Sequence, residues 1–236
     1  MTVRFRLPAP GIMKITEKEL NKRDLFGNPL IEGKVIADEL DDLYNEIISR
    51  REELYPGCMD VENDEDFNYI LTDWNTYHDY VCMHEFPRLQ VLFPVIVECL
   101  EAVNENPLDF YFKSWINIWP KGQAINPHRH YGEWHGYWVI RDTGTTTFYT
   151  SNELPRRSGG LPNQQEIIGL NNFDGHYVFM PAHMPHWAEK NTSTELRVSM
   201  GFNISSWSEV LREEEHDHNS RGSKIRDVVL PLKDYL

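Results

Sequence analysis

The spacing of apolar residues predicts helices in the first half of the chain. Residues 35–54 place apolar side chains three or four positions apart, with charged residues between them, which is typical of one face of a helix. These apolar positions are Ile36, Leu40, Leu43 and Ile47. Residues 73–104 repeat the spacing and predict one or two further helices. Residues 1–34, rich in Pro and Gly, predict an extended arm with a short helical turn at Thr16–Asn21.

After Pro107 the pattern changes to short runs of aromatic and β-branched residues. Residues 109–119 are apolar at most positions of both alternating sets, so they predict a strand buried on both faces. Six further runs predict strands: Trp134–Arg141, Thr145–Thr150, Gln165–Leu170, Tyr177–Met180, Trp187–Lys190 and Leu196–Ser205. Many short strands separated by turn residues are typical of a sandwich or barrel. A last apolar stretch, residues 228–232, is expected to dock back on the domain.

These elements predict an α+β chain that is mainly β, with N-terminal helices packed on a β core. We expect a single domain, residues 1–236. Residues 1–106 would form the arm and supporting helices, 107–206 the core, and 207–236 a polar tail that packs back. The length of 236 residues is enough for one large domain with a substantial core.

Charge and cysteine usage narrow the partners and the compartment. A formal net charge of −14 makes a nucleic-acid partner unfavourable. The three cysteines, Cys58, Cys82 and Cys99, are odd in number and have no CxxC spacing, which favours free thiols in a reducing compartment. No apolar run is long enough for a signal peptide or a membrane span. We expect a cytoplasmic protein without a membrane partner, and a homodimer stays open.

Three histidines form the candidate chemistry. His128 and His130 are two apart, which on a strand puts both side chains on one face. His186 follows two prolines, and strand pairing can bring it opposite the first two. We therefore predict that His128, His130 and His186 hold one metal ion. The alternative, that they are ordinary core or surface histidines, is open because the chain has ten.

The flanks of these histidines resemble the two cupin motifs of the double-stranded β-helix superfamily. In the first motif, Gly122 is followed after five residues by His128-x-His130. In the second, Gly175 is followed after five residues by Pro181 and after four more by His186. The chain is also similar to a group of 2-oxoglutarate/Fe(II)-dependent oxygenases common in phages and bacteria. The matching runs are residues 114–122, 127–130, 175–186 and 197–204. The likeness covers about residues 110–205 and implies a jelly-roll core.

The resemblance implies an Fe(II)- and 2-oxoglutarate-dependent oxygenase, a hydroxylase acting on a substrate C–H bond. Arg197 would bind the far carboxylate of 2-oxoglutarate, and Ser199, on the same strand face, would add a hydroxyl. Asn117 matches a strand position near this cosubstrate. Four tryptophans are candidates for the pocket lining: Trp115, Trp134, Trp138 and Trp187. The substrate, a small molecule or a protein side chain, is not specified.

The iron ligands of this family usually follow the pattern His-x-Asp/Glu with a second, distant His. This chain departs from it at one position, since residue 130 is His. His130 replaces the carboxylate, or Glu133 supplies it, or position 130 is no ligand. We favour the first, because parity puts His130 beside His128. His78 and His84 have no partner at ligand spacing and are taken as structural or surface residues. The other five histidines are taken as structural residues or weaker ligand candidates: His135, His176, His183, His216 and His218.

Two other functions remain open. One is a cupin-type dioxygenase or isomerase that uses the three-histidine metal without 2-oxoglutarate and has no need of Arg197. The other is a non-enzymatic structural or binding β-domain that keeps the fold, such as a virion component.

Overall fold

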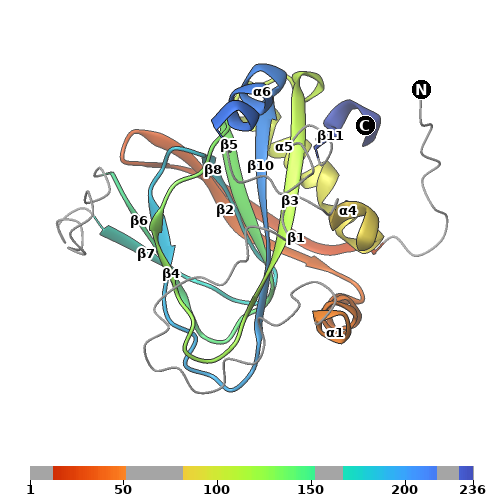
Figure 1. The fold of residues 1–236 in the computed structure, drawn as a ribbon, viewed down its shortest axis with the longest axis vertical. Coiled ribbons are helices and arrows are strands. Elements are labelled where there is room, and N and C mark those ends of the chain that lie inside the picture. The colour runs from red at the N-terminus through yellow and green to blue at the C-terminus, as the bar shows by residue number, and fades with distance from the viewer. Residues whose placement is uncertain (1–12, 52–81, 152–166, 217–228, 236) are drawn as a thin grey trace.

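The computed structural model describes residues 13–51, 82–151, 167–216 and 229–235, which form two antiparallel β-sheets with helices beside the larger one (Figure 1). The larger sheet has the order β1-β2-β8-β5-β10-β3-β11. Its strands are β1 (Ile15–Leu25), β2 (Asn28–Ala37), β3 (Phe110–Trp119), β5 (Trp134–Arg141), β8 (His176–Pro181), β10 (Arg197–Ser206) and β11 (Leu230–Pro231).

The smaller sheet faces the larger one and has the order β4-β9-β6-β7 (Figure 1). Its strands are β4 (Ile125–His128), β6 (Thr146–Thr150), β7 (Ile167–Asn171) and β9 (His186–Ala188). From β3 to β10 successive strands fall in alternate sheets, except for the pair β6 and β7. The chain therefore winds as a double-stranded β-helix, and the predicted fold class is confirmed.

Helices cover the face of the larger sheet that points away from the smaller one, except for the helix Trp207–His216, which lies over one end of the sheet (Figure 1). The helical segments are α1 (Leu40–Ser49), α4 (Cys82–Glu85), η1 (Pro87–Leu92), α5 (Phe93–Ala102), η2 (Pro107–Asp109), α6 (Trp207–His216) and η4 (Leu232–Tyr235). Phe93 of α5 meets Phe112 of β3 edge-on, with ring centroids 5.3 Å apart. Ile116, Trp138 and Phe202 belong to the same buried cluster. Strand β3 is buried on both faces, as predicted, because its other face lines a cavity between the sheets.

The N-terminal segment differs from the prediction. A helical turn at Thr16–Asn21 is wrong, because these residues lie in β1, which pairs with β2. Phe26 and Gly27 both have positive φ angles, 57° and 79°, which is the backbone of a tight hairpin turn. The helix predicted from residue 35 begins only at Leu40, because Val35 lies in β2 and its N–H donates to the carbonyl of Gly175.

The end of the chain returns to the core. Strand β11 pairs with β3, and Leu232 is fully buried, so the described part of the last apolar stretch packs on the core. The tail expected to be polar starts as helix α6. The predicted boundaries within the domain stay a prediction. His78, His218 and the end of the helix predicted over residues 35–54 lie outside the described residues. None of the described helices is long and apolar enough to cross a membrane.

Gly136 offers a test of the packing between β5 and its neighbours. A Cβ atom there would lie 2.3 Å from Cζ of Phe202 and 2.4 Å from the carbonyl oxygen of Val178. We expect Gly136→Ala to lower the free energy of unfolding by about 1–3 kcal/mol or more, since an overpacked core must shift. Urea unfolding measures this. Gly169→Ala is the control, because its new methyl would meet only side-chain atoms, at 3.0 Å. An unchanged unfolding midpoint for Gly136→Ala would contradict the packing described.

Candidate metal centre

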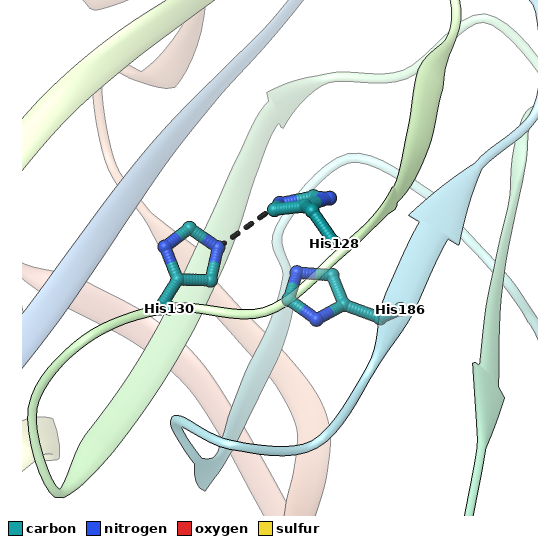
Figure 2. A group of neighbouring side chains, drawn as sticks. All are labelled: His128, His130 and His186. Carbon is teal, nitrogen blue, oxygen red and sulfur yellow. Dashed lines mark hydrogen bonds between the residues drawn. The ribbon is translucent and has the colours of Figure 1, made fainter. Parts of the chain in front are cut away.

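His128, His130 and His186 converge in the cavity between the two sheets (Figure 2). Their ligand-forming ring nitrogens all lie within 4.8 Å of one another. His128 ends β4 and is the register partner of His186, which begins β9. The sequence predicted His130 on the same strand as His128. In the structure His130 lies two residues past the end of β4. Its N–H donates to the carbonyl of Ala182 over 2.9 Å, which holds this segment beside β8.

The donor set fits a metal ion. Nε2 of His128 and Nε2 of His130 are 3.1 Å apart (Figure 2). Two nitrogens bound to one ion at about 2.1 Å would be separated by about 3.0–3.4 Å for right-angle to tetrahedral geometry. Nδ1 of His186 lies 3.1 Å from the carbonyl oxygen of Met184, so an N–H there donates to it and Nε2 keeps its lone pair. That these residues bind metal stays a prediction.

The protonation state of these rings also suits a metal. Burial lowers the pKa of His130 and of His186 well below the ordinary value, and the neighbouring histidines lower it further. Both rings are therefore neutral at pH 7, and the neutral imidazole is the form that binds metal ions.

Glu133 does not join this group. Its carboxylate accepts hydrogen bonds from the N–H of Ser206, at 2.9 Å, and from the Ser206 hydroxyl, at 2.5 Å. In the part of the chain that the structure describes, the histidine group contains no acidic residue. The structure thus gives no support to the alternative in which Glu133 completes the metal site.

A fourth histidine, His135 of β5, lies against the three. Its ring stacks on His130 with centroids 3.6 Å apart and an interplanar angle of 7°. Its Nδ1 is 3.0 Å from Oδ1 of Asn203, and burial lowers its pKa to about 3. From the sequence His135 was only a weaker ligand candidate, although its parity within Trp134–Arg141 places it on the same face as Tyr137, opposite Trp134 and Trp138.

Trp115 completes this stack. Its ring lies 5.4 Å from that of His130 and 5.9 Å from that of His135. Gly201 of β10 leaves the space, because a Cβ atom there would be 2.6 Å from two atoms of the indole ring. Trp115 and Trp187 line the cavity, as the sequence suggested.

For two of the four tryptophans the prediction of a place in the pocket is wrong. Trp134 and Trp138 belong to the cluster beneath the helices. Strand alternation turns them away from the cavity, and the indole N–H of Trp138 donates to the carbonyl of Val35 over 2.8 Å.

A buried arginine lines the same cavity. Arg197 is 2% exposed, and its guanidinium carbon lies 4.3 Å from the ring centroid of Trp119. Its Nε is 3.4 Å from a carboxylate oxygen of Asp142. Burial lowers the pKa of Arg197 and Asp142 raises it, so the side chain stays charged. Ser199 and Asn117 are cross-strand partners, and both line the cavity.

Two hydroxyl groups add to the cavity wall, those of Tyr137 and Thr147. The Tyr137 and Tyr149 hydroxyls are 2.7 Å apart, and burial raises the pKa of Tyr137 to about 12. Tyr137 is therefore protonated at neutral pH and able to donate a hydrogen bond. The cavity has a volume of about 170 Å³. This is small beside the roughly 300–1,000 Å³ of sites for drug-sized ligands, so it suits a small molecule.

No family model and no curated protein matches this chain. Among solved structures, AviO1 from Streptomyces viridochromogenes Tue57 is similar with a TM-score of 0.50 and 11% identity, over 76% of this chain and 90% of AviO1. The non-heme alpha-ketoglutarate-dependent carbocyclase SnoK from nogalamycin biosynthesis gives a TM-score of 0.49 and 13% identity, over 75% of this chain and 79% of SnoK.

Another similar structure is the nickel complex of the non-heme monooxygenase ThoJ, with a TM-score of 0.40 and 12% identity. That match covers 50% of this chain and 53% of ThoJ, so the chain spans about half the length of that protein. At these identities the similarity shows the fold alone. It agrees with the double-stranded β-helix described above.

His135 should position His130 for metal binding. We expect His135→Ala to weaken zinc or nickel binding about 10- to 100-fold, as is typical when a group that orients a ligand is lost. His135→Phe should recover most of the affinity, because it keeps a ring in the stack. Competition with a chromophoric chelator measures the affinity. His176→Ala is a matched control, since His176 is buried and bonded to Asn172 outside the cavity. Equal affinities for wild type and His135→Ala would contradict this role.

The buried histidines also predict a pH dependence of the metal-free protein. The pKa is lowered in the fold for four histidines, to about 3 for His135 and about 4 for His176, and well below the ordinary value for His130 and His186. Below pH 6.5 the unfolded chain binds protons that the folded chain does not, so stability falls with falling pH. Each histidine contributes up to about 1.4 kcal/mol per pH unit.

Urea unfolding at intervals from pH 7.5 to 5 checks this dependence. His176→Gln should lower the number of protons taken up on unfolding by about one, and it leaves the candidate metal ligands unchanged. A free energy of unfolding that does not change between pH 7 and pH 5.5 would contradict the assignment of neutral buried rings.

Proposed function

We propose that this protein is an Fe(II)- and 2-oxoglutarate-dependent oxygenase that couples decarboxylation of 2-oxoglutarate to oxidation of a substrate C–H bond. The observation that carries the proposal is that three convergent histidines and the buried Arg197 line one small cavity. The fold agrees with the proposal, because double-stranded β-helix proteins include such enzymes. The family resemblance of the sequence adds the cosubstrate.

Arg197 accounts for the choice of 2-oxoglutarate. A keto acid that chelates the metal carries a second carboxylate away from it, and that group needs a cation in a dry site. Arg197 is buried and presents a planar set of donors that matches a carboxylate. The hydroxyls of Ser199 and Tyr137 line the same cavity and would add hydrogen bonds. In a chain with a formal net charge of −14, a buried arginine at a small cavity favours an anionic ligand.

The histidines would hold the iron as neutral ligands. When bound, Fe(II) supplies the oxygen chemistry that side chains cannot perform. The Met184 carbonyl fixes the ring of His186, and His135 with Trp115 fixes that of His130. The rings of Trp115 and Trp119 would help to exclude water from the site. Because no carboxylate of the described residues joins the three rings, the ion would keep its full charge, which favours a dianionic cosubstrate.

The absence of an acid from the described histidine group also favours a second candidate, a cupin-type dioxygenase or isomerase with a three-histidine metal and no 2-oxoglutarate. This enzyme would have no need of a keto-acid site. Its metal-dependent activity would survive replacement of Arg197.

Anaerobic titration with Fe(II) and then 2-oxoglutarate tests the proposal. We expect a visible charge-transfer band from the chelate. His128→Ala should abolish the band, because it removes a ligand. Arg197→Met should raise the dissociation constant of 2-oxoglutarate roughly 10- to 100-fold, the loss of one charge-assisted bond, and leave Fe(II) affinity nearly unchanged.

Each other outcome points elsewhere. Tight Fe(II) binding without a band at saturating 2-oxoglutarate would reject the proposal in favour of the cupin-type enzyme. The absence of specific metal binding would reject both and leave a non-enzymatic β-domain.

A further inference from the structure

The cavity contains a second buried cation that the proposed cosubstrate does not use. Lys113 of β3 is 7% exposed and lines the cavity. Its Nζ lies 2.9 Å from Oε1 of Glu213, on α6, and the two side chains are only 9% and 11% exposed. Glu213 also lines the cavity. Replacing a buried ion pair by apolar residues is often neutral or stabilising, so stability alone does not explain charges at this wall.

Strands β3, β10 and β5 of the larger sheet form one wall of the cavity, which we call its floor. The strand register places Lys113 and Arg197 at opposite ends of this floor. Across β3, β10 and β5, one row of register partners is Lys113, Asn203 and His135. Two residues along β10 the row is Trp115, Gly201 and Tyr137. At the far end of β10, Arg197 is the partner of Trp119.

The histidines lie toward the Lys113 end of this floor. His130 stacks on both His135 and Trp115, which belong to the first two rows. A cosubstrate that joins the metal to Arg197 would therefore occupy the floor away from Lys113. The Lys113 end is left for the molecule that is oxidised.

The charges of the whole cavity lining favour an anion. Among the described residues that line the cavity, Lys113, Arg129 and Arg197 are positive and only Glu213 is negative. Glu213 extends from α6, which packs over the end of the sheet (Figure 1). A substrate anion can share Lys113 with Glu213, because an ammonium group has three donors.

We propose that Lys113 is a specificity-determining residue that binds a carboxylate or phosphate group of the oxidised substrate, so that the enzyme acts on an organic anion. This inference rests on the proposed function, since it assumes that 2-oxoglutarate takes the Arg197 end. Glu213 holds the lysine in place and tempers its affinity for anions.

The test uses the full chain loaded with zinc and saturated with 2-oxoglutarate, which keeps the Arg197 end occupied. The probes are two matched pairs: benzoate with benzamide, and phenyl phosphate with phenol. Titration calorimetry gives their dissociation constants. We expect at least one anion to bind tenfold or more tightly than its neutral partner. Lys113→Met should reduce that ratio to about one, and Glu213→Gln should raise it severalfold, because the competing charge is gone.

The two variants separate binding from folding. Loss of the pair as a merely structural contact would weaken anion binding in both variants, whereas the proposal requires opposite effects. If Lys113→Met does not fold, the anion preference of Glu213→Gln still tests the proposal, which requires that preference to rise above that of the wild type. Equal affinities within both pairs, or a preference that survives in Lys113→Met, would overturn the proposal.

The proposed function is checked separately by titrating 2-oxoglutarate into the zinc-loaded protein. Failure of that binding rejects the oxygenase, and the probe titrations are then repeated with zinc alone. A preference for anions that depends on Lys113 would still support the anion site without the oxygenase.

Discussion

The register between β3, β10 and β5 is the constraint on which the cavity depends. Alternation along β10 points Arg197 and Ser199 into the cavity, while Met200 and Phe202 belong to the hydrophobic cluster. A slip of one residue would exchange these two sets and bury charge among the helices. The helices beside the larger sheet therefore do more than cover it, because their apolar contacts make the exchanged register costly.

The smaller sheet contributes two of the three candidate metal ligands. The larger sheet lines the cavity with cations, hydroxyls and aromatic rings, but the candidate ligands His128 and His186 come from β4 and β9. The cavity thus depends on strands from both sheets. Each buried floor cation is paired with an acid from outside the floor strands, Arg197 with Asp142 and Lys113 with Glu213. These pairs place two positive charges beside the candidate metal site without leaving either cation uncompensated.

Much of this arrangement follows from local patterns in the sequence. Residues 110–119 carry aromatic and β-branched side chains at both odd and even positions, so burial of this strand on two faces was predictable. The shared face of Arg197 and Ser199 was predictable because they are two residues apart on a strand. The tryptophans show the limit of this reasoning. Trp115 and Trp138 are equally apolar, and only the position of the helices decides which faces the cavity. His135 was missed for a similar reason, since its neighbour in space, His130, lies outside a strand, where parity gives no guidance.

The pairing of His128 with His186 makes the candidate metal site a product of long-range topology. These residues are far apart in the chain, so only the pairing of β4 with β9 brings them together. An ion held by both would close a long loop and so act as a crosslink, whose benefit grows with the entropy of the open chain. Metal added during refolding should then select chains in which β4 and β9 have already met, and a chelator should act most strongly on the last step of assembly rather than the first.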